Sequence, residues 1–200
     1  MAIKAVVFDM GGVIVKLAPL TEVLAGVDLA HDELMERWIL SKAVRSFEAG
    51  QCDIDEFADT LIDEFALPYD RPTLIERFAA FPQGLFDGAV DMVAAVRERC
   101  VTGILSNTNE FHWGSQPDHE IVESLFDCEY LSCRLGLVKP DAAIYEYVID
   151  DLGLAPEQIL FLDDNQINVD GALAVGMRSA VARGPVEATA VLTHFGVLAT

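Results

Sequence analysis

Residues 3–13 read IKAVVFDMGGV, and this stretch decides the fold. The mostly apolar run Ile3–Phe8 predicts a buried strand, and the glycine pair after it predicts the turn that closes the strand. Asp9 is the first residue after the run and stands directly before the turn. A turn accounts for Gly11 and Gly12 but not for a lone carboxylate at the end of a buried strand. Asp9 is therefore the first candidate for a functional residue.

Length and composition limit the class of protein. The chain has 200 residues, 52% of them hydrophobic, which suits one domain, or one domain with an inserted subdomain, around a sizeable core. Its 13 Lys and Arg against 33 Asp and Glu give a formal net charge of −20, which disfavours nucleic acid and anionic membrane surfaces as partners. A phosphorylated substrate would meet the same repulsion, so its site would need local positive charge.

The cysteines and the apolar runs bear on where the protein resides. Four cysteines without a C-x-x-C pair are typical of reduced thiols. No apolar run reaches the length of a membrane span, and no signal-type apolar region precedes Asp9. We expect a cytoplasmic protein that does not enter a membrane.

The pattern of strands and helices predicts an α/β fold. Apolar strands at 101–106, 128–131, 159–162 and 177–182 alternate with helical segments, which is typical of a doubly wound parallel sheet. Residues 16–87 differ, because helical patterns fill them and no such strand occurs. One helix is expected over 31–42, and another follows the capping-box pattern at 53–56. We therefore predict a core domain of residues 1–15 and 88–200 with an inserted helical cap of residues 16–87.

Polar residues stand where the predicted core strands end. Asp9 follows the first strand, Ser106-Asn107 close the second, and Asp163-Asp164 close a later one, while Lys139 precedes a helix. Ligands of doubly wound sheets lie beyond the carboxyl ends of the strands, so these side chains should converge on one crevice. Taken singly, each is an ordinary cap, loop or surface residue. The combination is far more specific.

This combination resembles the haloacid dehalogenase superfamily of hydrolases. FDMGGV, ILSNTN, VKPDAAIY and FLDDNQINVDGA are similar to its four motifs, in order along the chain. The resemblance implies a Rossmann-like core with an inserted cap, and it is closest to bacterial phosphatases of small molecules, sugar phosphates above all. The expected partner is then a small phosphorylated substrate.

The resemblance also implies roles for the motif residues. Asp9 would be the nucleophile that forms an aspartyl-phosphate, and Lys139, Ser106 and Asn107 would hold the phosphoryl group. Mg²⁺ would be bound by Asp9, Asp164 and the carbonyl of Gly11, with Asp163 in its outer shell. Asn165 and Asn168 either shape this acidic loop or are ordinary turn and cap residues. Three carboxylates against Mg²⁺ and Lys139 give a neutral balance.

Gly11 departs from the family, because most of its phosphatases have Asp there as general acid and base. Such help is worth about 10²–10⁴-fold in rate. Either the substrate has an acidic leaving hydroxyl, as a sugar 1-phosphate has, or another carboxylate replaces the missing one. Glu48, in the predicted cap, is a candidate for that carboxylate, although it also suits a solvated charge near a turn.

Two other functions stay open. A catalytically impaired protein would bind phosphate without turning it over. A metal-free 2-haloacid dehalogenase would use the same nucleophile with a nearby arginine, but the Asp163-Asp164 pair argues against it and nothing in the sequence places Arg45 there.

Several cap and loop residues, and two further properties, are likewise not assigned. His112, Trp113 and His119 either line the mouth of the site or pack the loop. Trp38 and Phe47 either wall the site or pack helices together. The physiological substrate and the oligomeric state are not set by the sequence.

Overall fold

The computed structural model describes residues 2–115 and 117–199, and its centre is a five-stranded parallel sheet. The strand order is β5-β4-β1-β6-β7, with β1 in the middle. Phe8, the last residue of β1, lies between Ile104 of β4 and Leu162 of β6. The predicted doubly wound parallel sheet is therefore confirmed. The strands are β1 (Ala5–Phe8), β4 (Val101–Ser106), β5 (Cys128–Leu131), β6 (Ile159–Asp163) and β7 (Arg178–Val181).

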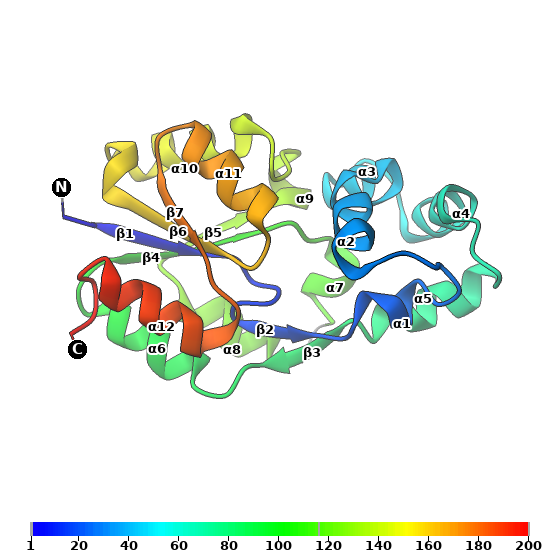
Figure 1. Ribbon diagram of the computed structural model, residues 1–200, viewed down its shortest axis with the longest axis horizontal. Coiled ribbons are helices and arrows are strands. Elements are labelled where there is room, and N and C mark those ends of the chain that lie inside the picture. The colour runs from blue at the N-terminus through cyan, green and yellow to red at the C-terminus, as the bar shows by residue number, and fades with distance from the viewer. Residues whose placement is uncertain (1, 116, 200) are drawn as a thin grey trace.

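Helices cover both faces of this sheet (Figure 1). Alternate residues of a strand point to opposite faces, so Val6 and Phe8 pack on one side and Ala5 and Val7 on the other. The first face is covered by α6 (Ala89–Arg97), α8 (His119–Leu125) and α12 (Gly184–His194). The second is covered by α10 (Ala142–Leu152) and α11 (Gln166–Ala174). Short elements complete this part of the chain: α7 (Glu110–Trp113), α9 (Ser132–Leu135) and the 3₁₀ turn Pro156–Gln158.

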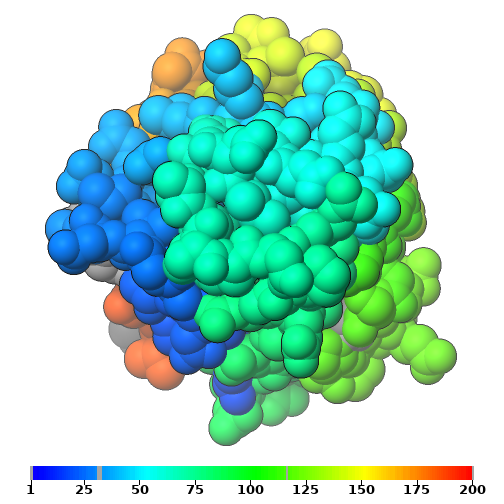
Figure 2. Space-filling model, turned by 90° about the vertical axis from the view of Figure 1, so that its right-hand side faces the viewer, coloured from blue at the N-terminus to red at the C-terminus, as the bar shows by residue number. Residues whose placement is uncertain are grey.

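Five helices form the cap, a separate layer at one end of the molecule (Figure 1). They share a hydrophobic cluster of their own, distinct from the two clusters on the sheet. Figure 2 looks onto this end and shows the cap side chains spread across it. The helices are α1 (Leu20–Val23), α2 (His31–Leu40), α3 (Lys42–Glu48), α4 (Ile54–Phe65) and α5 (Arg71–Ala79).

The cap differs from the sequence prediction in two places. The helix expected over 31–42 ends at Leu40, and α3 starts anew because the Ser41 side chain caps it by accepting a hydrogen bond from the backbone N–H of Val44. Residues 16–87 were also predicted to hold no strand, which is wrong: β2 (Val15–Leu17) pairs antiparallel with β3 (Pro82–Leu85). This ribbon lies where the chain passes between sheet and cap (Figure 1), close to the predicted domain limits.

Within the described ranges, 2–115 and 117–199, no helix has both the length and the apolar character needed to cross a membrane.

Candidate active site

The three polar strand ends meet at one edge of the sheet, as the sequence predicts. Asp9 follows β1, and Ser106 and Asp163 are the last residues of the neighbouring strands β4 and β6. All three are buried, Asp163 completely. From β1, the chain adds strands first on one side (β4, β5) and then on the other (β6, β7). The carboxyl end of β1 is therefore the point where doubly wound sheets bind their ligands.

The turn after Asp9 needs only the second of its two glycines for steric reasons. Gly12 has a φ of 73°, and a Cβ there would lie 2.3 Å from Oδ2 of Asp164. Gly11 is outside the left-handed region, and a Cβ there would meet the flexible Leu17 side chain at 2.9 Å. Gly12 thus lets the first turn approach the acidic loop, whereas the backbone itself does not exclude a side chain at Gly11.

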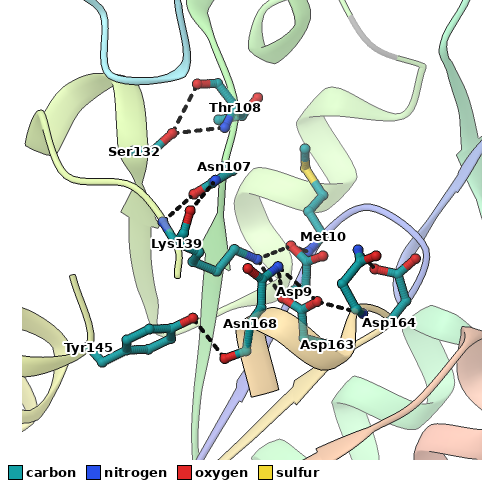
Figure 3. A network of polar contacts seen from close by, with 11 residues as sticks. Asp9, Met10, Asn107, Thr108, Ser132, Lys139, Tyr145, Asp163, Asp164 and Asn168 are labelled. Atoms are coloured by element: carbon teal, nitrogen blue, oxygen red, sulfur yellow. Dashed lines mark hydrogen bonds and ion pairs between the residues drawn. The ribbon is translucent and has the colours of Figure 1, made fainter. Parts of the chain in front are cut away.

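Lys139 joins two of the carboxylates. Its Nζ donates hydrogen bonds to Oδ1 of Asp9 at 2.8 Å and to Oδ2 of Asp163 at 2.7 Å (Figure 3). The Lys139 side chain is 1% exposed. Oδ1 of Asp9 also accepts from the N–H of Met10 at 2.7 Å. The ammonium is thereby held against the oxygen of Asp9 that faces the main chain, and Oδ2 is the oxygen left for other contacts.

Asn107 positions this lysine through the main chain. Its Oδ1 accepts from the Lys139 N–H at 2.9 Å, and its Nδ2 donates to the Lys139 carbonyl at 3.1 Å. Arg45 of the cap donates to the same carbonyl at 3.3 Å and to the Asp141 carboxylate at 2.6 Å. The sequence suggested Asn107 only as a phosphate ligand, so its hold on Lys139 was missed. Arg45 lies at the contact between cap and core.

The acidic loop after β6 is held by its two asparagines. Asn165 donates its N–H to Asp163 at 2.9 Å and its Nδ2 to Asp164 at 2.6 Å. Nδ2 of Asn168 donates to both oxygens of Asp163 at 3.1 Å, and the main-chain carbonyl of Asn168 accepts from the Tyr145 hydroxyl at 2.8 Å (Figure 3). Of the two roles considered for these asparagines, they shape the loop.

Burial and like charge raise the proton affinity of Asp9 and Asp164. Loss of hydration raises the pKa of Asp9 well above its usual value, and Asp163 and Asp164 add to this while Lys139 opposes it. The same loss of hydration, with Asp163 beside it, raises the pKa of Asp164 to about 7. Burial disfavours the charged lysine, but Asp163 and Asp9 outweigh it and raise the pKa of Lys139. Lys139 is therefore a fixed positive charge.

These carboxylates fit a divalent cation. One oxygen each from Asp9, Asp163 and Asp164 lies within 4.8 Å of the others, close enough to share an ion. Three carboxylates against one lysine leave two negative charges to be balanced, and hard oxygen donors suit Mg²⁺. Oδ1 of Asn168 is buried and has no hydrogen-bond partner among the described residues. It is available to a water molecule bound to such an ion.

A cavity of about 120 Å³ lies between this polar cluster and the cap. Asp9, Gly11, Ser106, Asn107, Lys139 and Asp164, all predicted from the sequence, line it. Glu48, at the end of α3, lines the same cavity from the cap side. Loss of hydration raises the pKa of Glu48 to about 7, against the opposing effect of Lys139, Asn107 and Arg45. The cavity therefore contains a carboxyl group able to exchange a proton near neutral pH.

The other residues with open roles divide between the cavity and the packing around it. His112 lines the cavity, but its Nε2 bonds to the Phe78 carbonyl at 2.7 Å, and burial lowers its pKa to about 4, so it is neutral. Trp113 is buried and packs edge-on against His119 with ring centroids 5.3 Å apart. Trp38 and Phe47 belong to the cap cluster and also wall the cavity.

Comparison with known proteins agrees with this architecture. Residues 3–176 match the haloacid dehalogenase-like hydrolases, and the chain belongs to this family. It is 28% identical over 176 residues to a D-ribitol-5-phosphate phosphatase of Bacteroides thetaiotaomicron, which covers 84% of this chain and 85% of that protein. It is 30% identical over 183 residues to a sesquiterpene phosphatase of Aspergillus oryzae, with 87% of each covered.

A solved structure shares the fold. An enzyme of the same family from Bacteroides thetaiotaomicron, determined with magnesium and inorganic phosphate, superposes with a TM-score of 0.69 at 25% identity. The match covers 91% of this chain and 95% of that one, so it includes both the sheet and the cap.

Proposed function

We propose that the protein is a Mg²⁺-dependent phosphatase that hydrolyses a small phosphorylated metabolite through an aspartyl-phosphate on Asp9. The observation that supports this most is the buried cluster in which Lys139 bonds both Asp9 and Asp163 while Asp164 lies alongside. Such a cluster binds a divalent cation and a dianionic group together. The relatives that act as phosphatases, and the related enzyme solved with magnesium and phosphate, agree with it.

The first chemical step follows from the geometry of Asp9. Lys139 and the Met10 N–H both bond to Oδ1, so Oδ2 attacks phosphorus. The new bond joins Oδ2 to phosphorus, the bond from phosphorus to the leaving oxygen breaks, and its electron pair stays on that oxygen. Bound Mg²⁺ supplies the positive charge that the phosphoryl oxygens need as they approach these carboxylates. Ser106, buried at the end of β4, lines the cavity where those oxygens lie.

Glu48 is the proposed proton donor for the leaving oxygen. Gly11 has no side chain to supply this proton, whereas Glu48 lines the cavity with a pKa of about 7. Once it has given up its proton, the carboxylate takes one from the water that attacks the aspartyl-phosphate, which returns Asp9 and releases phosphate. One group thereby serves both steps.

The alternatives from the sequence have less support. A metal-free dehalogenase does not need three carboxylates around a single lysine. A protein that only binds phosphate does not need the carboxylate of Asp9 oriented with one oxygen free. The relatives include phosphatases of both a polyol phosphate and a sesquiterpene, so a sugar phosphate substrate stays a prediction.

The test is release of phosphate from acetyl phosphate and p-nitrophenyl phosphate with Mg²⁺. Asp9→Asn should abolish turnover and the labelling of the protein with phosphate, and EDTA should do the same reversibly. Asp91→Asn, an equivalent change at an exposed position of α6, should have no effect. Turnover by Asp9→Asn above background, or full activity in EDTA, would refute the proposal.

A further inference from the structure

The cap wall of the cavity is almost entirely apolar. Apolar cap side chains line it, among them Met35, Trp38, Ile39, Phe47, Phe78 and Phe81. The rings of Phe47 and Phe78 pack against one another with centroids 6.1 Å apart, and Phe78 also packs against Trp38 at 6.2 Å. The leaving group of a substrate, which points away from Asp9, has to lie against this wall.

Several neutral polar groups that line the cavity from the sheet domain are already engaged in hydrogen bonds. Oδ1 of Asn109 accepts from the His112 N–H at 2.9 Å, and Nε2 of His112 bonds to the Phe78 carbonyl at 2.7 Å. Asn107 uses both ends of its amide on the Lys139 main chain. Among the described residues that line the cavity from the cap, Glu48 is the ionisable one. On the cap side, the hydroxyls of a leaving group would therefore meet Glu48 and otherwise apolar side chains.

We infer that the site takes a phosphate monoester of a mostly apolar alcohol, in which a further polar group would face Glu48. This inference rests on the proposed function and narrows its substrate from any small metabolite to one chemical class. Each CH₂ buried against the wall strengthens binding about fourfold. Each hydroxyl buried without a partner weakens it by about 5- to 150-fold.

Two phosphates of matched skeleton test the inference. Pentyl phosphate and ribitol 5-phosphate both carry a primary phosphate on five carbons and differ in four hydroxyls. With Mg²⁺, we expect kcat/KM for pentyl phosphate to exceed that for ribitol 5-phosphate by at least about a hundredfold. The hydroxyls make ribitol the better leaving group, so the intrinsic reactivity of the two phosphates favours ribitol 5-phosphate, opposite to the expected preference. Equal rates, or faster cleavage of ribitol 5-phosphate, would overturn the inference.

Acetyl phosphate separates this failure from failure of the proposed function, because its small activated leaving group needs nothing from the cap. Hydrolysis of acetyl phosphate that depends on Asp9, without any preference for pentyl phosphate, would refute the substrate class alone. No hydrolysis of acetyl phosphate would refute the phosphatase itself. Binding to the Asp9→Asn protein with Mg²⁺, measured by calorimetry, gives a second readout, in which pentyl phosphate should again bind more tightly than ribitol 5-phosphate.

A pair of variants on α2 checks that the wall is responsible. Met35→Gln keeps the length of the side chain but puts an amide into the wall, and it should lower the ratio of pentyl to ribitol phosphate turnover about tenfold. Met35 is only half-buried, so folding should survive the change. Leu40→Gln makes a similar change on the same helix at a position that is 49% exposed, and it should leave the ratio unaltered. A ratio unaffected by Met35→Gln would also count against the inference.

Discussion

Replacing Glu48 by glutamine removes the proposed proton donor while keeping nearly the same shape. Gly11 leaves the first motif without a general acid, so the loss of activity in Glu48→Gln should depend on how much the leaving oxygen needs a proton. For an alkyl phosphate, turnover should fall by about 10²–10⁴-fold. For p-nitrophenyl phosphate, the leaving phenolate is stable without a proton. The rate at which the first turnover releases p-nitrophenol should therefore fall no more than a few-fold.

The pKa of Glu48 sets the pH dependence. With a pKa of about 7, Glu48 is about nine-tenths protonated at pH 6 and about one-tenth at pH 8. Cleavage of an alkyl phosphate, measured in single turnovers, should therefore fall about tenfold from pH 6 to pH 8 in the wild type. The Glu48→Gln protein should lack this dependence, because glutamine does not titrate.

Stability gives an independent check on the same group. A carboxyl whose pKa is raised in the folded state holds its proton more tightly there than in the unfolded chain. Its contribution to stability is then present below its ordinary pKa and is lost as pH rises through about 7. Glu48→Gln should consequently unfold at a higher temperature than the wild type at pH 8, by an amount that shrinks towards pH 5.

A matched variant makes the Glu48 result interpretable. Glu76→Gln makes the same change at an exposed position of α5 and should leave both rates and the pH profile unchanged. An alkyl phosphate turned over by Glu48→Gln at the wild-type rate, with the wild-type pH profile, would mean that another group donates the proton.

Three further predictions concern the charge cluster. Asp164→Asn should weaken activation by Mg²⁺ more than Asp163→Asn, measured as the Mg²⁺ concentration for half-maximal activity, because Asp164 is the proposed direct ligand. Lys139→Met should cost about 3–5 kcal/mol of unfolding free energy in EDTA, since it leaves two buried carboxylates without their cation. Urea titration should show part of that loss recovered by Mg²⁺, and a variant as stable as the wild type would contradict the reasoning. Gly11→Asp, whose Cβ would meet the flexible Leu17 side chain, should speed alkyl phosphates most and flatten the dependence of rate on leaving-group pKa; no gain for alkyl phosphates would show that the general acid is not missing.

The sequence predicts the sheet and the meeting of its strand ends because both depend on local patterns. Apolar runs define the strands, and a parallel sheet brings their carboxyl ends to one edge, so the positions of Asp9, Ser106 and Asp163 follow. The presence of Asp164 beside them follows from its place in the chain. Glu48 was one candidate among many acidic residues, and its place in the cavity depends on how the cap packs.

Contacts between segments far apart in the chain are what the sequence does not predict. Nothing local to Asn107 shows that its amide holds the main chain of Lys139, 32 residues further on. The β2–β3 ribbon was missed because Val15–Leu17 is too short for a periodic signal and Pro82 argues against a strand. The bond from His112 to the Phe78 carbonyl joins α7 to α5, two helices whose meeting depends on the whole fold.

The Lys139 carbonyl accepts hydrogen bonds from both Asn107 and Arg45, and these two donors belong to different bodies. Asn107 is part of the sheet domain, and Arg45 belongs to α3 of the cap. If the cap moves away from the sheet domain to exchange product for substrate, the Arg45 contacts to Lys139 and Asp141 must break. The hydrogen bonds between the Asn107 amide and the Lys139 main chain stay in place. The Arg45–Asp141 ion pair is partly exposed, and a pair near the surface contributes about 0–1 kcal/mol, so this contact between cap and core is weak. Such a movement of the cap would therefore leave Lys139 positioned between Asp9 and Asp163.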